Sequence, residues 1–309
     1  MSRIVVIGGA GFLGRELIAA LDDREVICFD RVPLSSSTPL PPRGAQKLGD
    51  ATDPAKLRDC IAGADSVWIR AGVLGGAAST QVDRAAEYIS GNVDLVRSVL
   101  AACGDLGCRT VFFDSTEQVW GTSGDLERLV AEDEPMAPNF YGASKSISEK
   151  LLRHWAAEEA ERSVQIFRYS RVHGARSRDV VYYMVKSALA GDPIRIIGNP
   201  LHRISFVHVE DVIAANLLAL RSRPSFAIYQ VSCDRPYSLL ELAQLVMDVV
   251  GHRVPIRFEP AAHAALPFEP FVTGMDWERS SQELGFSPRW SVCDIIREAG
   301  DSLAAATSA

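Results

Sequence analysis

A tyrosine and a lysine four residues apart are the side chains of this sequence best suited to acid–base chemistry. Tyr141 and Lys145 stand near the start of NFYGASKSISEKLL, a stretch whose pattern predicts a helix. In a helix, this spacing places both side chains on one face. A tyrosine has an ordinary pKa of about 10 and is a poor base at neutral pH, but a nearby cation favours the tyrosinate. We therefore expect Tyr141 to take a proton from a hydroxyl group, helped by the ammonium of Lys145.

Hydroxyl side chains that can work with this pair follow a short apolar run. Residues 110–113 predict a strand, and the segment FFDSTEQVWG continues it with Ser115 and Thr116. Ligands of parallel sheets bind at the carboxyl ends of the strands, so we expect these hydroxyls to face the tyrosine. We expect Thr116 to donate a hydrogen bond to the reacting oxygen, with Ser115 as the alternative donor. The predicted catalytic group is Thr116, Tyr141 and Lys145.

The N-terminal segment VVIGGAGFLG carries three glycines in the pattern of a phosphate-binding turn. Gly8, Gly11 and Gly14 stand between a predicted strand at residues 4–7 and a predicted helix at residues 12–21. Gly8 permits a tight turn, Gly11 lets the backbone approach a pyrophosphate, and Gly14 lets the helix pack closely on the strand. The helix N-terminus offers free N–H groups to the phosphates. This place, at the first strand-to-helix turn, predicts a bound dinucleotide.

An acidic residue at the end of the second predicted strand, residues 25–29, indicates which dinucleotide binds. The Asp30 carboxylate can accept hydrogen bonds from the adenosine ribose hydroxyls and would repel a 2′-phosphate, which favours NAD. The guanidinium of Arg31 could instead bind a 2′-phosphate, so NADP stays as the alternative. A nicotinamide fits the rest of the sequence, because a hydride acceptor needs a base such as Tyr141, and Lys145 can also reach the nicotinamide ribose.

The order of the predicted elements indicates an α/β fold. Strands and helices alternate through the first half of the chain, which is typical of a parallel sheet covered on both faces. Right-handed connections make this a Rossmann-type doubly wound parallel sheet. After residue 168 proline and arginine become frequent and short strands lie among loops. We expect an NAD-binding Rossmann domain and a smaller C-terminal α/β substrate lobe, the first at residues 1–170 and 204–231 and the second at 171–203 and 232–309.

Composition and charge limit the partners. The chain has 309 residues, of which 47% are hydrophobic and 23% charged, and its formal net charge is −7. Its cationic residues are scattered, so neither a nucleic acid nor a membrane is expected as a partner. The N-terminus lacks the pattern of a secretory signal, and the six cysteines form no CxxC pair, which together favour a cytoplasmic protein with reduced cysteines. No metal-ligand spacing is present, so no metal is expected.

Taken together, these motifs resemble the extended short-chain dehydrogenase/reductases, the NAD-dependent epimerase/dehydratase family, over nearly the whole chain. GGAGFLG resembles its cofactor turn, YGASK its catalytic helix and DSTEQVWG its serine/threonine loop. LGDATD resembles the segment that contacts adenine, VWIRAG the cofactor lining after the fourth strand, and NVDLVRSVL a family helix. The resemblance implies a cofactor site formed by Gly8, Gly11, Phe12, Leu13, Gly14, Asp30, Arg31, Asp50, Ala51, Ala71, Gly72, Asn92, Tyr141 and Lys145.

The resemblance also implies substrate-binding residues, and here the chain departs from the family. HRISFVHVEDV resembles the segment whose arginine, Arg203 in this chain, binds a nucleotide-sugar diphosphate. RYSRVHGAR carries Arg171 where an asparagine is usual and His173 where a tyrosine is usual. A second phosphate-binding arginine, usual before the C-terminal aspartate, is missing from PFEPFVTGMD. We expect Glu117, Arg171 and Arg203 to contact the substrate.

Two residues after Thr116 bear on the type of reaction. The sugar dehydratases of the family carry Asp-Glu there as an acid and a base, whereas this chain carries Glu117 and Gln118. An amide cannot remove a proton, so dehydration by that mechanism is not expected. We expect NAD-dependent oxidoreduction at a sugar or nucleotide-sugar hydroxyl, ending in epimerisation through a keto intermediate. Two alternatives stay open: a net NAD(P)-dependent dehydrogenase or reductase on a non-nucleotide hydroxy or keto substrate, and a dinucleotide-sensing binding protein without turnover.

Two long amphipathic helices, expected at residues 81–103 and 139–161, bear on the oligomeric state. In the family such a pair of helices forms a four-helix interface between two subunits. The resemblance therefore implies a homodimer that acts on a small-molecule substrate.

Overall fold

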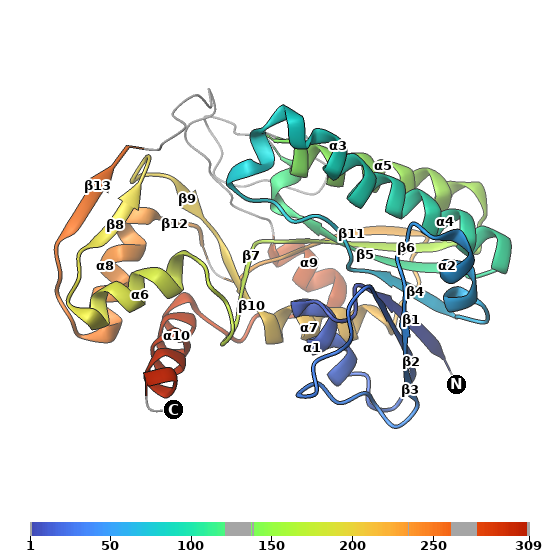
Figure 1. The fold of residues 1–309 in the computed structure, drawn as a ribbon, viewed down its shortest axis with the longest axis horizontal. Helices are drawn as coiled ribbons and strands as arrows, with labels where there is room; N and C mark the ends of the chain where they lie inside the picture. The colour runs from blue at the N-terminus through green and yellow to red at the C-terminus, as the bar shows by residue number, and fades with distance from the viewer. Residues whose placement is uncertain (1, 121–136, 138, 234, 261–276, 308–309) are drawn as a thin grey trace. The chain divides into compact units, whose positions relative to one another are not determined.

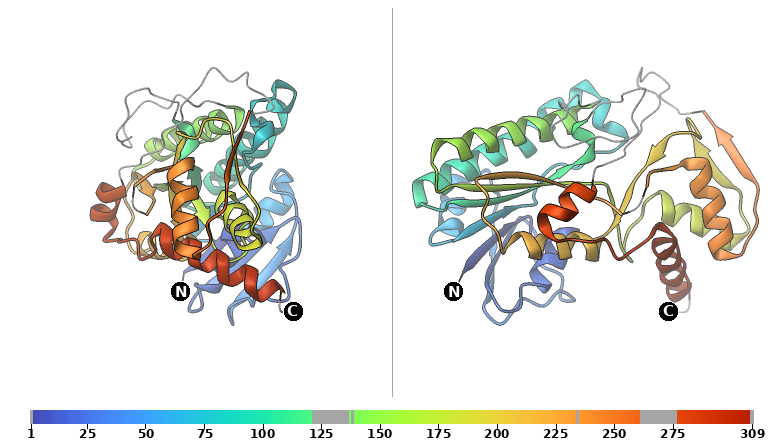
Figure 2. Two further views of the ribbon diagram at one scale, coloured as in Figure 1. Left: turned by 90° about the vertical axis from the view of Figure 1, so that its left-hand side faces the viewer. Right: turned by 180° about the vertical axis from the view of Figure 1, so that it is seen from behind.

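The chain folds into two compact units. The computed structural model describes residues 2–120, 137, 139–233, 235–260 and 277–307 (Figures 1 and 2). Of these, unit 1 holds residues 2–120, 137, 139–168 and 213–229, and unit 2 holds the described residues of 169–212 and 230–307.

Unit 1 is built on a seven-stranded sheet. In spatial order its strands are β11 (Phe226–Val231), β6 (Ser163–Tyr169), β5 (Thr110–Thr116), β4 (Ser66–Ile69), β1 (Arg3–Ile7), β2 (Glu25–Asp30) and β3 (Gly44–Leu48). The pairs among β1 to β5 are parallel, with Ile4 opposite both Val26 and Ser66. The chain runs outward from β1 in one direction and resumes at β4 on its other side. Such a switch point is where open parallel sheets bind ligands.

Helices cover both faces of this sheet (Figure 1). One face carries α3 (Ala85–Tyr88), α4 (Leu95–Leu106) and α5 (Phe140–Glu158), and the opposite face carries α1 (Phe12–Ala19) and α7 (Val209–Ala219). Helix α2 (Pro54–Ile61) packs against α4. The doubly wound Rossmann sheet expected from the alternating pattern is therefore confirmed.

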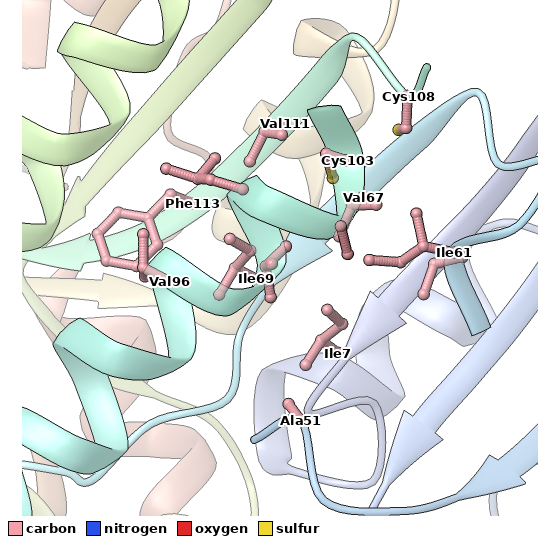
Figure 3. Close-up of a cluster of buried hydrophobic side chains, with 14 of the residues drawn as sticks. Ile7, Ala51, Ile61, Val67, Ile69, Val96, Cys103, Cys108, Val111 and Phe113 are labelled. Carbon is pink, nitrogen blue, oxygen red and sulfur yellow. The ribbon is translucent and has the colours of Figure 1, made fainter. Parts of the chain in front are cut away.

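The core between the sheet and α2, α4 and α5 is apolar and closed to solvent. Figure 3 shows strand and helix residues meeting there: Ile7, Val67, Ile69, Val111 and Phe113 from the strands, and Ile61, Val96 and Cys103 from the helices. Because strand residues alternate between faces, Trp68 points to the other side of β4, where its ring stacks on Phe112 at 4.4 Å between centroids. Each central strand is thus buried on both faces, as a parallel sheet requires.

One expected helix of unit 1 is divided in the structure. The helix expected at residues 81–103 is divided into η2 (Val82–Arg84), α3, a π-helical turn η3 (Ile89–Asp94) and α4. A π turn inserts one residue into the helical repeat, so side chains after it point in a new direction.

Unit 2 contains sheets of two strands each and three helices that pack against one another. Its three two-stranded sheets pair β7 (Arg171–His173) with β10 (Phe206–His208), β9 (Arg203–Ile204) with β12 (Tyr237–Ser238), and β8 (Ile194–Ile197) with β13 (Ile256–Glu259). Helices α6 (Val180–Ala190), α8 (Leu239–Val250) and α10 (Val292–Thr307) pack around a second apolar core, and α9 (Trp277–Leu284) precedes α10. The segment that returns to unit 1 begins at residue 213 and not at the expected 204, because β9 and β10 pair with strands of unit 2, and it ends with β11 at Val231.

Among the described residues, no helix combines the length and the apolar character that a membrane span requires.

Candidate active site

The glycine turn stands at the carboxyl end of β1, at the switch point of the sheet. Gly8 has φ +85°, a backbone conformation that favours glycine, and its N–H donates to the Phe29 carbonyl oxygen at 2.8 Å. A Cβ atom at Gly8 would collide with the backbone of Ala71, and one at Gly14 would collide with the Gly8 carbonyl oxygen. The turn therefore brings the ends of β1, β4 and α1 into backbone contact. The predicted reasons for Gly8 and Gly14 agree with this geometry.

The first turn of α1 is open to an anion. Its N-cap is Gly11, which has no side chain to occupy the free N–H groups of the helix. The Asp30 carboxylate orders the approach to this turn by accepting hydrogen bonds from the N–H groups of Ala10 at 2.9 Å and Val32 at 3.2 Å. Arg31 lies 3.9 Å from the Asp50 carboxylate in an exposed ion pair. The cradle fits a dinucleotide pyrophosphate, and Arg31 already faces an anion of the protein.

An asparagine fixes the loop that follows β4. The amide of Asn92 accepts from the Val73 N–H at 2.7 Å and donates to the Val73 carbonyl at 3.1 Å and to the Ser144 hydroxyl at 2.8 Å. Asn92 lies in the π turn, which aims its buried side chain at this loop. The predicted cofactor residues Ala71 and Gly72 precede Val73. Asn92 therefore holds their loop against α5, whatever contact it makes with a cofactor.

The end of β5 and the start of α5 meet so closely that the hydroxyls of two predicted site residues come together. Asn139 caps α5 by accepting from the Gly142 N–H at 2.8 Å. A Cβ atom at Gly142 would collide with the Gln118 carbonyl oxygen in η4 (Glu117–Val119). The side chains of Tyr141 and Thr116 are hydrogen-bonded in this junction. The predicted base therefore lies beside Thr116, the expected hydrogen-bond donor. The alternative donor, Ser115, bonds to Glu149 instead.

The pKa of Tyr141 differs from the sequence expectation. Burial of the ring raises it to about 12, and the nearby charges of Asp114 and Glu117 add to this. The hydrogen bond from Thr116 acts in the opposite direction and lowers it. A fall caused by Lys145 was expected, but its ammonium donates to the Asp114 carbonyl oxygen at 2.9 Å. Burial is therefore the main influence on the pKa of this tyrosine.

Lys145 is buried one helical turn after Tyr141, as the four-residue spacing predicts. Its ammonium lies 4.6 Å from the centroid of the Phe113 ring and is bound to the backbone of β5. Burial lowers the pKa of Lys145 to about 8, while the carboxylates of Asp114 and Glu149 raise it. The ammonium is therefore held in place with little solvent around it.

Two buried arginines behind this group were not found from the sequence. Arg168 on β6 pairs with Glu149 of α5 at 2.7 Å and lies over the Trp120 ring. Arg70, directly after β4, pairs with Asp114 at 3.2 Å. Two signals in the sequence could have revealed these arginines. One is a charged residue in or next to an apolar strand run, and the other is a glutamate four residues after Lys145.

The predicted substrate residues fall in different units. Glu117 of unit 1 is buried next to Thr116, and its charge reaches Tyr141. In unit 2, Arg171 is exposed at the start of β7, and Arg203 lies 3.1 Å from the Glu241 carboxylate. His173, which replaces the usual tyrosine, bonds to Asp179 at 3.0 Å, in line with a structural role.

Comparisons with known proteins agree with the geometry of unit 1. Residues 4–232 match the model of the "NAD dependent epimerase/dehydratase family". The chain belongs to this family. It is 29% identical to a UDP-glucose 4-epimerase of Azospirillum brasilense, over 96% of this chain and 90% of the relative. It is 26% identical to a dTDP-4-dehydro-6-deoxy-D-allose reductase of a Streptomyces species, over 93% of this chain and 91% of the relative.

A solved structure of the family extends the likeness to the full chain. MoeE5 in complex with UDP-glucuronic acid and NAD superposes with a TM-score of 0.85 at 25% identity, covering 99% of this chain and 100% of that one. Membership of the epimerase/dehydratase family confirms the predicted use of NAD and the prediction of an enzyme of the extended short-chain type.

Two adjacent glycines test how closely the loop after β4 holds Tyr141. A Cβ atom at Gly75 would lie 2.5 Å from Cδ1 of Tyr141, whereas one at Gly76 would meet nothing within 4 Å. Gly75→Ala should displace the tyrosine ring and lower kcat of the NAD-loaded enzyme roughly 10- to 100-fold. Gly76→Ala is the matched control and should leave kcat unchanged. Equal rates for both variants would show that the loop does not position Tyr141.

The buried lysine predicts a pH dependence of stability. Its pKa is about 8 in the folded protein and 10.5 in the reference state, so between these values the unfolded chain binds more protons. Stability from this group must then rise as pH increases from about 8 to 10.5. Lys145→Met should remove that rise. The measurement is the thermal unfolding temperature of the cofactor-free wild type and variant across this pH window. If the unfolding temperature depends on pH in the same way in both proteins, the prediction that Lys145 has a lowered pKa is wrong.

Proposed function

We propose that the protein is an NAD-dependent epimerase that inverts a carbinol carbon of a nucleotide sugar through a keto intermediate. The observation that carries the proposal is the hydrogen-bonded pair of Thr116 and Tyr141 beside the buried ammonium of Lys145. This group stands in the same unit as a glycine turn that fits NAD. The names of the relatives support the substrate class, because they include a UDP-glucose 4-epimerase and a structure with UDP-glucuronic acid bound.

The residues of unit 1 divide the chemistry among them. Bound NAD supplies the hydride acceptor for oxidation of the carbinol and the hydride donor for reduction of the ketone. Tyr141 takes the hydroxyl proton at its phenolic oxygen during oxidation and returns it during reduction. With substrate bound, the Thr116 hydroxyl would turn its single proton from Tyr141 to the reacting oxygen and stabilise negative charge there. Lys145 contributes a fixed positive charge that favours the tyrosinate.

The cofactor itself would be held by the end of β1 and its neighbours. The N–H groups at the start of α1 receive the pyrophosphate between Gly11 and Gly14, with Phe12 and Leu13 in the first turn. Asp30 receives the adenosine ribose, Asp50 and Ala51 lie on the adenine side, and the loop with Ala71 and Gly72 lines the remainder. These assignments follow the family pattern, and the backbone contacts at Gly8 and Gly14 support them.

Substrate recognition is proposed for Glu117, Arg171 and Arg203. Glu117 is a buried carboxylate adjacent to Thr116 and suits a substrate hydroxyl. A diphosphate would compete with Glu241 for the guanidinium of Arg203, and Arg171 offers an exposed second cation. The pairing of Arg203 with Glu241 also favours a second candidate, a net reductase or dehydrogenase acting on a substrate without a nucleotide. A 2-alkyl-3-oxoalkanoate reductase of Stenotrophomonas maltophilia is 27% identical over 81% of this chain.

We also propose a cytoplasmic homodimer. The six cysteines are free thiols, which suits a reducing compartment. Apolar side chains are exposed along the helical layer from η2 to α5, as a helical interface requires: Val82 in η2, Ile89 in η3 and Ile147 in α5. Light scattering of the purified protein at micromolar concentration should give twice the mass of the chain. A mass of one chain would contradict the dimer.

The proposed reaction is tested by what the purified protein carries. An epimerase keeps its cofactor between the two half-reactions, so denaturation should release near-stoichiometric NAD or NADH, identified by chromatography and mass. Incubation with UDP-sugars should then give an epimer without net change in nicotinamide absorbance. A protein that is purified empty and changes nicotinamide absorbance continuously with substrate would instead be a dehydrogenase or reductase.

A further inference from the structure

Two buried ion pairs lie behind Lys145, and the proposed proton transfer uses neither of them. Nη1 of Arg70 lies 3.2 Å from Oδ2 of Asp114, and Nη2 of Arg168 lies 2.7 Å from Oε2 of Glu149. The four side chains are between 2% and 9% exposed. Removing a charged side chain from water is unfavourable, and the attraction to its ion-pair partner offsets about as much free energy as the desolvation costs. Two such pairs in one core therefore call for a role beyond stability.

Asp114 contacts Lys145 through its backbone and is fixed through its side chain. Its carbonyl oxygen accepts from the ammonium at 2.9 Å, while its carboxylate accepts from Nε1 of Trp68 at 2.8 Å. The guanidinium of Arg70 is itself anchored, because it donates to Oδ1 of Asn216 and lies 4.8 Å from the centroid of the Trp68 ring. The carboxylate thus has one orientation, on the strand that also binds the ammonium.

Glu149 approaches Lys145 from the helix side. It lies four residues after Lys145, hence on the same face of α5. Arg168 binds both of its oxygens, with Nε to Oε1 at 3.0 Å and Nη2 to Oε2 at 2.7 Å. The Ser115 hydroxyl also donates to Oε1, which joins Glu149 to the residue before Thr116. One buried network therefore links the lysine, the end of β5 and β6.

Within the part of the chain that the structure describes, the carboxylates of Asp114 and Glu149 are the anions that act on the Lys145 ammonium. Strand β5 presents the Phe113 ring and Asp114, and α5 presents Glu149 and the un-ionised phenol of Tyr141. Burial lowers the pKa of Lys145 to about 8, and the negative charge of Asp114, followed by that of Glu149, acts against this fall. The guanidiniums of Arg70 and Arg168 lie on the far side of these carboxylates as their ion-pair partners. A lysine this dry needs anions to remain charged at neutral pH.

We propose that Asp114 and Glu149 are positioning residues that hold Lys145 as an ammonium in the active site, and that Arg70 and Arg168 set how strongly they do so. The role rests on the proposed function of Lys145, because the enzyme benefits only if that ammonium acts on Tyr141. Each arginine orients its carboxylate and offsets part of the negative field that the carboxylate exerts on Lys145. The two ion pairs therefore keep Lys145 charged at a position where little water is present to stabilise the ammonium.

The charge of Lys145 can be titrated directly in the full-length protein. The lysines of the chain are Lys47, Lys56, Lys145, Lys150 and Lys186, so carbon-13 labelling of lysine gives a simple NMR spectrum in which Lys145→Arg assigns the signal. Asp114→Asn should lower the titration midpoint of Lys145 by about half a pH unit or more. Arg70→Gln should raise it, because Asp114 keeps its charge and the opposing cation is lost. Asp105→Asn, which removes an exposed partner of Arg58, is the control and should leave the midpoint in place.

Shifts of opposite sign separate charge from damage to the fold. Disruption of the core by either substitution would move the midpoint in one direction only, and a downward shift in both variants would overturn the proposal. An unchanged midpoint in folded Asp114→Asn protein would overturn it as well. Removing one member of a buried pair can unfold a protein. Glu149→Gln changes the other ion pair and gives an independent measurement, with the same expected downward shift, if Asp114→Asn does not fold.

Kinetics distinguish this proposal from the proposed function. In the active enzyme, Asp114→Asn should move the alkaline limb of the pH–rate profile by the same amount as the NMR midpoint, whereas a purely structural defect lowers the rate equally at every pH. If Lys145→Met loses turnover but Asp114→Asn moves neither quantity, the proposed function stands and the positioning role fails. If the midpoint moves but Lys145→Met turns over normally, the coupling stands and the catalytic role of Lys145 fails.

Discussion

The contact between the first turn of α5 and the end of β5 is the constraint on which the rest of the site depends. Gly142 lets the helix backbone approach the Gln118 carbonyl, so the side chains of Tyr141 and Thr116 meet. The helical repeat then carries Lys145 and Glu149 along the same face, each four residues after the last. Because α5 lies along the sheet, a shift of its first turn would move Tyr141, Lys145 and the ion pairs behind them together.

Desolvation is the second theme of the site. Burial raises the pKa of Tyr141 to about 12 and lowers that of Lys145 to about 8, so the two groups are driven toward their neutral forms. A proton acceptor needs the opposite arrangement, with a tyrosinate beside an ammonium. The fixed anions Asp114 and Glu149 favour the charged lysine, although Asp114 also raises the pKa of Tyr141, and the positive ring of oxidised NAD would favour the tyrosinate. The protein thus maintains a dry site and supplies charge to it from buried side chains.

Much of the fold and of the chemistry could be predicted from the sequence. Glycines at fixed spacing and strands alternating with helices specify the sheet and its nucleotide turn, because each is a local requirement of backbone geometry. The spacing of Tyr141 and Lys145 follows from the helical period, and Thr116 from the place where β5 ends. The π turn at η3 was not predictable, since it depends on the long-range bonds of Asn92 to Val73 and Ser144.

Electrostatic properties were the least predictable part. A nearby lysine suggests a lowered pKa for Tyr141, but the outcome depends on burial and on where the ammonium is bound, which pattern alone does not specify. The pairing of Arg70 with Asp114 joins residues 44 positions apart, one directly after β4 and one in β5, and the sequence shows only two charges next to apolar residues. Contacts of this kind become visible when the strand order places β4 beside β5.

The claim that Tyr141 is the proton acceptor is tested most directly by Tyr141→Phe, which removes one oxygen and keeps the ring. The variant should retain bound NAD, because the glycine turn is unchanged, and should lose turnover by about 100-fold or more. Tyr183→Phe, at an exposed tyrosine of α6, should keep the wild-type rate and serves as the control. Turnover of folded, NAD-loaded Tyr141→Phe protein at the wild-type rate would contradict the proposed mechanism.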